Sequence, residues 1–193
     1  MADEVVFTVE DLEVVGDLAL AAWAAAVDRD WSVPAGTLEW SCLATADHTI
    51  DCVFSYALFL ASRKTDGYPA FDLLRALPGA GPADMVDGLR AVVGMLAAVI
   101  RAAPPGARAT LFSGGGRPVV TGPAPFAPRG GLELALHAHD VCSGLGVDLA
   151  LPAEVCARLL AATDGWPGGA DGWLPTGDPW TDLLTRSGRP APG

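Results

Sequence analysis

The stretch Gly131-Leu-Glu-Leu-Ala-Leu-His-Ala-His-Asp140 predicts a helix and, with it, the helical class of the chain. Glu133 and His137 stand four positions apart, so in a helix both side chains project from one face. A second helix-like run, from 44 to 52, carries His48. If the two helices pack side by side, His48 joins Glu133 and His137, and two imidazoles and one carboxylate come together.

Two histidines and one carboxylate can bind a divalent metal and leave a coordination position for water or substrate. Zinc suits this set of ligands, and nickel, manganese and iron can also be accepted. The metal could hold a thiol as its thiolate, or it could lower the pKa of a bound water. The alternative interpretation is structural: Glu133 and His137 are an ordinary solvated helix pair, and His48 is a core residue.

Apolar residues recur at intervals of three and four in four segments of the chain, which predicts four principal helices. The first follows a capping-box pattern at Thr8–Asp11, and the second is capped by Ser41 and runs to about Lys64. The third spans Asp84 to Arg101, and the fourth runs roughly from Gly131 to Ser143. With little strand content, this pattern favours an all-α four-helix bundle, in which sites commonly form between facing helices.

Shorter elements are expected between and after these helices. Phe71 to Ala76 could form a short turn of helix, and another short helix should extend from Leu151 through Ala162. A Gly-rich turn separates Thr110–Phe112 from Val119–Thr121, which predicts a short β-hairpin in the long irregular connection before the fourth helix.

The C-terminal tail, from about 163 to 193, is rich in Gly and Pro but carries Trp166, Trp173 and Trp180. Three indoles are costly to leave in water, so the tail should pack back over the bundle. Stacking of these rings on a ligand is the alternative. A length of 193 residues fits one domain that includes this tail, residues 1–193.

The chain is acidic, with 23 Asp and Glu against 12 Lys and Arg and a net charge of -11. This charge disfavours contact with nucleic acid or with anionic membrane surfaces. Apolar runs are broken before about 18 residues, and the N-terminus begins Met-Ala-Asp-Glu, so neither a membrane span nor a signal peptide is expected. Four cysteines occur singly, as expected for free thiols in a reducing compartment, and the default location is cytoplasmic.

Three motifs together resemble one known superfamily. The run Trp40-Ser-Cys-Leu-Ala-Thr-Ala-Asp-His48 is similar to the Trp-Thr-x-x-x-Leu-x-x-His opening of that family's second helix. Glu133-x-x-x-His137, with His139-Asp140 and Gly144-Leu-Gly-Val-Asp-Leu-Ala-Leu-Pro152, is similar to its fourth helix and the exit from it. Gly177 to Gly188 is similar to a closing segment of its actinobacterial members. The chain thus resembles the DinB-like superfamily, in the group around mycothiol-dependent maleylpyruvate isomerase.

The resemblance implies that His48, Glu133 and His137 bind a divalent metal, usually zinc, in a pocket at one end of a four-helix bundle. It also implies use of the low-molecular-weight thiol mycothiol as a co-substrate. Ala46 and Asp47 depart from the Leu/Ala pair usual before the histidine, and Asp47 adds a charge near the site. The superfamily also includes thiol transferases and hydrolases, so the shared residues define the metal better than the reaction.

Two carboxylates lie one helical turn beyond the histidines: Asp51 follows His48, and Asp140 follows His137. Each could orient its imidazole or carry a proton. The alternative for both is a solvated or capping carboxylate. His139 is rotated about 200° from His137 around the helix, so we expect it outside the metal's ligand set.

Three further side chains are candidates near the site. Arg129 could bind a substrate carboxylate, or it is an ordinary surface arginine. Tyr56, two turns beyond His48, could line the pocket or belong to the core. Cys52 could approach the metal, although a buried, inert thiol is the simpler interpretation.

The leading functional hypothesis is a metal-dependent thiol enzyme, an S-transferase or a thiol-assisted isomerase that acts on a small electrophilic substrate. A metal-dependent hydrolase of the same fold and a non-catalytic small-molecule-binding protein are the alternatives. The expected partners are therefore the substrate and a low-molecular-weight thiol. A homodimer is compatible with the sequence, which does not define the oligomeric state.

Overall fold

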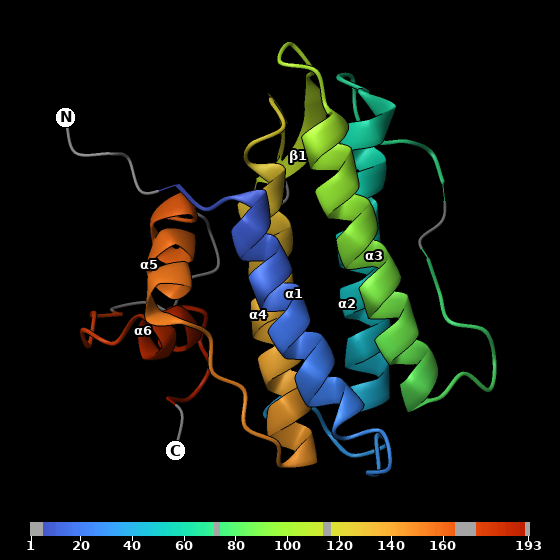
Figure 1. Cartoon of the computed structure of the whole chain (residues 1–193), viewed down its shortest axis with the longest axis vertical. Coiled ribbons are helices and arrows are strands. Elements are labelled where there is room, and N and C mark those ends of the chain that lie inside the picture. Colours follow the sequence, from blue (N-terminus) through green and yellow to red (C-terminus); the bar gives the residue numbers. More distant parts are fainter. Residues whose placement is uncertain (1–5, 72–73, 114–116, 165–172, 192–193) are drawn as a thin grey trace.

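The computed structural model describes residues 6–71, 74–113, 117–164 and 173–191, and most of them are helical (Figure 1). This helical content is compatible with the predicted all-α class, and the sheet found in these ranges has only two strands. No helix within them is long and apolar enough to cross a membrane. The elements are α1 Val9–Ala24, α2 Cys42–Ser62, α3 Pro82–Ala102, β1 Ala109–Ser113, β2 Arg117–Thr121, α4 Phe126–Leu145, α5 Ala153–Ala162 and α6 Pro179–Arg186.

The four long helices, α1 to α4, lie side by side and enclose the core (Figure 1). Both α1 and α2 pack against α3 and against α4. Each helix contributes fully buried side chains to the space between them, which is the arrangement that removes most apolar surface from water. These side chains include Leu12, Trp23, Leu60, Leu89, Leu96 and Leu134.

Capping residues set the starts of the first two helices. Thr8 and Asp11 form the predicted capping box, and the Ser41 hydroxyl accepts a hydrogen bond from the Ala44 amide at the start of α2. The predicted end of α2 near Lys64 is slightly late, because Arg63 adopts a left-handed conformation (φ 51°) and ends the helix at Ser62. These boundaries place His48 in the second turn of α2.

The fourth helix begins at Phe126, so the predicted start near Gly131 is wrong. Pro128 lies in the first turn, where its missing N–H would have no partner within the helix. Gly130 and Gly131 lie against Leu96 and Phe7, and a Cβ at either glycine would come within 2.5 or 2.6 Å of those side chains. The glycines therefore permit close packing of α4 rather than interrupting it.

The connection between α2 and α3 is irregular. The turn of helix predicted for Phe71 to Ala76 is not present in its described part, and residues 72–73 lie outside the described ranges. The amide of Leu74 donates to Asp51 Oδ1 (3.0 Å) and that of Ala76 donates to Asp47 Oδ1 (2.8 Å). Because side chains of α2 bind these amides, the segment lies along α2 without forming its own helical hydrogen bonds.

The predicted hairpin is present. β1 and β2 pair antiparallel, with Ala109 opposite Thr121 and Leu111 opposite Val119. The Thr110 amide donates to the Lys64 carbonyl (2.8 Å), which ties the hairpin to the end of α2.

The tail forms α6, which packs against α5, and α5 packs against α4 on the side away from the α2–α3 connection (Figure 1). Trp180 is buried, and the Trp173 indole donates to Thr185 Oγ1 (3.0 Å). Trp166, the third tryptophan of the prediction, lies outside the described residues. An ion pair between Arg189 and Asp140 joins the tail to α4.

Candidate metal centre

His48, Glu133 and His137 come together where α2 packs against α4. One ligand atom from each lies within 4.8 Å of the other two, in the only such group of metal-binding side chains among the described residues. The two imidazole rings are 5.2 Å apart, centroid to centroid, and His137 Nε2 lies 3.6 Å from Glu133 Oε2. All three residues are half-buried, so the group is held by the fold but stays within reach of a small molecule.

A buried carboxylate and a tail arginine support His137 from behind. His137 Nδ1 lies 3.2 Å from Asp140 Oδ2, and only 2% of Asp140 is exposed. Arg189 donates to both oxygens of Asp140, from Nε to Oδ1 (2.8 Å) and from Nη2 to Oδ2 (2.6 Å). A carboxylate that receives the Nδ1–H leaves Nε2 as the lone-pair nitrogen, which is the arrangement usual for a metal-binding histidine.

Tyr56 and Arg129 support Glu133 in a similar way. The Tyr56 hydroxyl donates to Glu133 Oε1 (3.2 Å), Arg129 Nη2 lies 3.2 Å from the same oxygen, and Arg129 Nε donates to the Tyr56 hydroxyl (2.9 Å). These contacts engage Oε1, while Oε2 is the oxygen that faces His137. Tyr56 is buried, so its place is beneath the carboxylate rather than on an open pocket wall.

The electrostatics of the site suit cation binding. Burial acts to raise the pKa of Glu133, but the close contact with His137 and the charge of Arg129 outweigh it, so the pKa lies below its usual value. Burial and the proximity of His137 lower the pKa of His48. Glu133 is therefore ionised and His48 neutral at pH 7, and these are the protonation states that metal ligands need.

His137 shows the opposite shift. Burial alone would lower the pKa of His137, but its hydrogen bond to Asp140 and its close contact with the Glu133 carboxylate raise it overall. Burial also acts to raise the pKa of Asp140, and the hydrogen bonds from His137 and Arg189 reverse this and lower it. Metal binding would therefore compete with protonation of His137, with Asp140 as the charged acceptor of its Nδ1–H.

Cys52 lies close to His48 but outside the three-residue group. Its Sγ is 3.4 Å from His48 Nε2. Burial, together with the charges of Glu133 and Asp51, raises the pKa of the Cys52 thiol to about 12. In this arrangement Cys52 is a neutral thiol. The other cysteines, Cys42, Cys142 and Cys156, are free and buried.

The candidate Asp51 makes its contacts away from His48 and His137, and His139 lies outside the metal-binding group, as expected. Asp51 is almost fully buried, and its oxygens bind the Leu74 amide and the Arg75 guanidinium (2.8 Å), so its contacts go to the α2–α3 connection. His139 is not in the metal-binding group and stacks edge-on against Trp180, with centroids 5.6 Å apart.

Sequence analysis did not identify two arginines at this site. Arg189 supports Asp140 from the tail, and Arg75 lines a cavity of about 210 Å³ together with His48, Trp40, Ala44 and Asp47. The Trp40 indole lies edge-on to the His48 ring, with centroids 5.1 Å apart. Neither arginine lies at a helical spacing from a ligand, so no periodic signal marks them. The one indication in the sequence that these arginines have specific roles is that basic residues are scarce, with 12 Lys and Arg in 193 positions.

Comparisons of the chain with protein-family models, with curated proteins and with solved structures found no match. The case for a metal centre therefore rests on the geometry of the residues themselves. The donor set fits a divalent ion, because it combines two imidazoles, one ionised carboxylate and outer hydrogen bonds to two of the three ligands.

Proposed function

We propose that this protein is a metal-dependent thiol enzyme, an S-transferase or thiol-assisted isomerase built on a DinB-like four-helix bundle. His48, Glu133 and His137 are its metal ligands. The convergence of their donor atoms within 4.8 Å, from two helices far apart in sequence, is the observation that carries the proposal. The resemblance of the same residues to the motifs of the mycothiol-dependent group supports zinc as the ion and mycothiol as the thiol.

The surrounding residues have defined tasks in this proposal. Asp140, held by Arg189, accepts the Nδ1–H of His137 and keeps its Nε2 available. Tyr56 and Arg129 hold one oxygen of Glu133 so that the other faces the histidines. A divalent ion in this position supplies a Lewis acid that stabilises a thiolate at neutral pH.

The cavity beside His48 is the proposed binding site for the electrophile. Its volume of about 210 Å³ suits a small substrate, and Trp40 gives it an apolar wall. Arg75 reaches its edge with 53% of the side chain exposed, so a substrate carbonyl or carboxylate can approach the guanidinium. Arg75 therefore replaces Arg129 as the better candidate for substrate binding, because Arg129 binds Tyr56 and Glu133 inside the protein.

A hydrolase could use the same ligands. The contacts of the nearby carboxylates help to decide between a hydrolase and a thiol enzyme. Metal-dependent hydrolases commonly use a carboxylate as general base beside the ion. Here Asp51 binds Arg75, Asp140 binds Arg189 and His137, and Glu133 binds Tyr56 and Arg129. Asp47, the carboxylate that lines the cavity beside His48, accepts the Ala76 amide through Oδ1. A thiol that is already deprotonated needs no such base, so this arrangement favours thiol chemistry.

The first experiment measures metal content by elemental mass spectrometry after purification and reconstitution with zinc. We expect about one equivalent in the native chain and a large loss in His48→Ala and Glu133→Ala, because each change removes one of three ligands. His139→Ala is the matched control and should retain its metal.

The second experiment adds mycothiol and a panel of small electrophiles to the zinc-loaded protein. Substrate consumption that requires both the thiol and the metal would support the proposal. Hydrolysis of activated esters without any thiol would instead identify a hydrolase, and metal binding with neither activity would favour a binding protein.

The free thiols and the thiol co-substrate lead us to infer a cytoplasmic location.

A further inference from the structure

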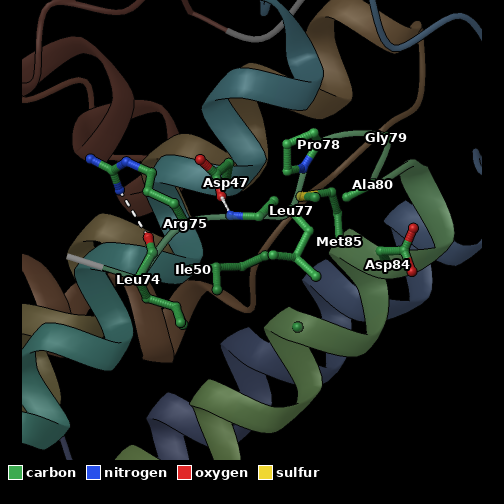
Figure 2. Close-up of a pocket in the computed structure, with 12 residues that line it drawn as sticks. Asp47, Ile50, Leu74, Arg75, Leu77, Pro78, Gly79, Ala80, Asp84 and Met85 are labelled. Carbon is green, nitrogen blue, oxygen red and sulfur yellow. Dashed lines mark hydrogen bonds between the residues drawn. The ribbon is translucent and has the colours of Figure 1, made fainter. Parts of the chain in front are cut away.

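A second, larger cavity lies between α2, α3 and the connection that joins them. Its volume is about 470 Å³, within the range of small-molecule sites. Figure 2 shows Ile50 from α2 and Leu77 from the connection pointing toward each other, with Met85 of α3 beside them. Asp47 and Arg75 line this cavity and also the smaller one beside His48, so the two cavities are neighbours.

Two carboxylates bind the ends of the segment 76–81, which covers this cavity. Asp47 Oδ1 accepts the amide of Ala76 (2.8 Å), and Asp84 Oδ2 accepts the amide of Gly81 (2.7 Å). These hydrogen bonds anchor both ends of the segment 76–81, whose middle residues cover the cavity (Figure 2). The cavity is therefore formed before any ligand arrives, which lowers the entropy cost of binding.

The charge around the cavity is negative. A hydrogen bond from a neutral amide does not cancel the charge of a carboxylate, so Asp47 and Asp84 each bring a negative charge to the lining. Arg75, the one cationic residue among the described residues of the lining, is paired with Asp51 (2.8 Å). Figure 2 shows its guanidinium directed away from Ile50 and Leu77.

Leu77 presents an apolar surface of the lining to water. Leu77 is 80% exposed although it faces Ile50 and Met85, which are buried. A bound apolar group would cover Leu77 and remove this surface from water. The cavity thus offers an apolar surface and a negative charge next to each other.

We propose that this cavity binds a small molecule that joins an apolar body to a positively charged amine. The body packs against the exposed Leu77, with the buried Ile50 and Met85 beneath it, and the negative charges of Asp47 and Asp84 at the two ends of the segment 76–81 attract the ammonium group. This site needs no metal and goes beyond the function proposed for the His48 centre.

Fluorescence titration with dansylcadaverine, an apolar dye on a primary amine, tests the site. We expect saturable binding that weakens about fivefold in Asp47→Asn and in Asp84→Asn, as for loss of one exposed ion pair. Asp87→Asn is the matched control, because it removes the same charge from α3 at a residue that does not line the cavity. Leu77→Ala should also weaken binding, and Ala80→Phe should block it by filling the cavity.

Several results would overturn the proposal. These are equal binding of the acidic analogue dansylglycine, equal weakening by Asp87→Asn, or no saturable binding to the folded protein. A dimer in sedimentation experiments that Leu77→Ala disrupts would show instead that a second copy of the chain covers this face. Binding should be the same after metal chelation, which keeps this test independent of the metal centre.

Discussion

The two helices that form the candidate metal centre hold its three residues in different ways. On α4, Glu133 and His137 each have an outer partner: Glu133 binds Tyr56 and Arg129, and His137 binds Asp140. On α2, His48 lies against the neutral thiol of Cys52 and the indole of Trp40. Charged, buried contacts thus orient the α4 ligands, while the packing of α2 brings the third. We infer that the α4 residues, with Tyr56 of α2 holding Glu133, define the geometry of the candidate centre and that His48 completes it.

The largest effect is expected from His137→Ala. It removes one of the two α4 ligands that have outer partners. We expect zinc affinity to fall by more than about 100-fold, since loss of an outer partner alone lowers metal affinity by about 10- to 100-fold. Competition with a chromophoric zinc chelator measures the change. His139→Ala, two positions away on the same helix, should differ little from the native protein. Equal losses in both variants would contradict the helix face assigned to the ligands.

A smaller effect is expected from Asp140→Asn. The amide can still accept the His137 Nδ1–H but loses the charge that pairs with Arg189, so zinc affinity should fall by about 10-fold or more. The same titration detects it, with circular dichroism to confirm that the helices remain. An unchanged affinity would mean that metal binding by His137 does not depend on the Asp140 carboxylate.

Arg189→Gln tests whether the tail takes part. It keeps Asp140 and removes the paired donation to both carboxylate oxygens, so we expect a loss smaller than that of Asp140→Asn. Arg186→Gln, in the same tail but bonded to the Leu160 carbonyl, is the control for general tail disruption. A similar loss in both would assign the effect to tail packing instead.

The pKa values of His48 and His137 should be shifted in opposite directions in the metal-free protein. The pKa of His137 is raised by Asp140 and Glu133 despite burial, and that of His48 is lowered by burial and by His137. NMR titration of the imidazole Cε1–H signals should place His137 above about 6.5 and His48 below it. In Asp140→Asn the His137 value should decrease, and a value that stays constant would remove Asp140 as its cause.

The smallest effect is expected from Cys52→Ala. The thiol contacts His48 but is neutral, since its pKa is raised to about 12, so zinc affinity should change by less than about threefold. Cobalt substitution provides a second measurement, because a thiolate ligand gives an intense charge-transfer band near the ultraviolet. Such a band in the native chain, absent in Cys52→Ala, would show that Cys52 is a fourth ligand, so that α2 would contribute two ligands instead of one.

Local patterns predicted much of this molecule. The capping box at Thr8, the N-cap at Ser41 and the hairpin before α4 are properties of a few consecutive residues, and each is found as predicted. The start of α4 was misjudged, because Gly130 and Gly131 resemble helix breakers until Leu96 and Phe7 are seen against them. The role of those glycines depends on neighbouring helices, which periodicity cannot show.

In the candidate site, too, some features follow from local sequence and others depend on how the helices pack. The sequence by itself determined that Glu133 and His137 share a face, because helical geometry relates residues four positions apart. Only the tertiary structure decided that His48 joins them, that Tyr56 reaches Glu133 across 77 positions, and that Arg189 reaches Asp140 across 49. Contacts at such separations follow from how the helices and the tail pack to bury apolar surface, and no local pattern encodes which polar groups that packing brings together.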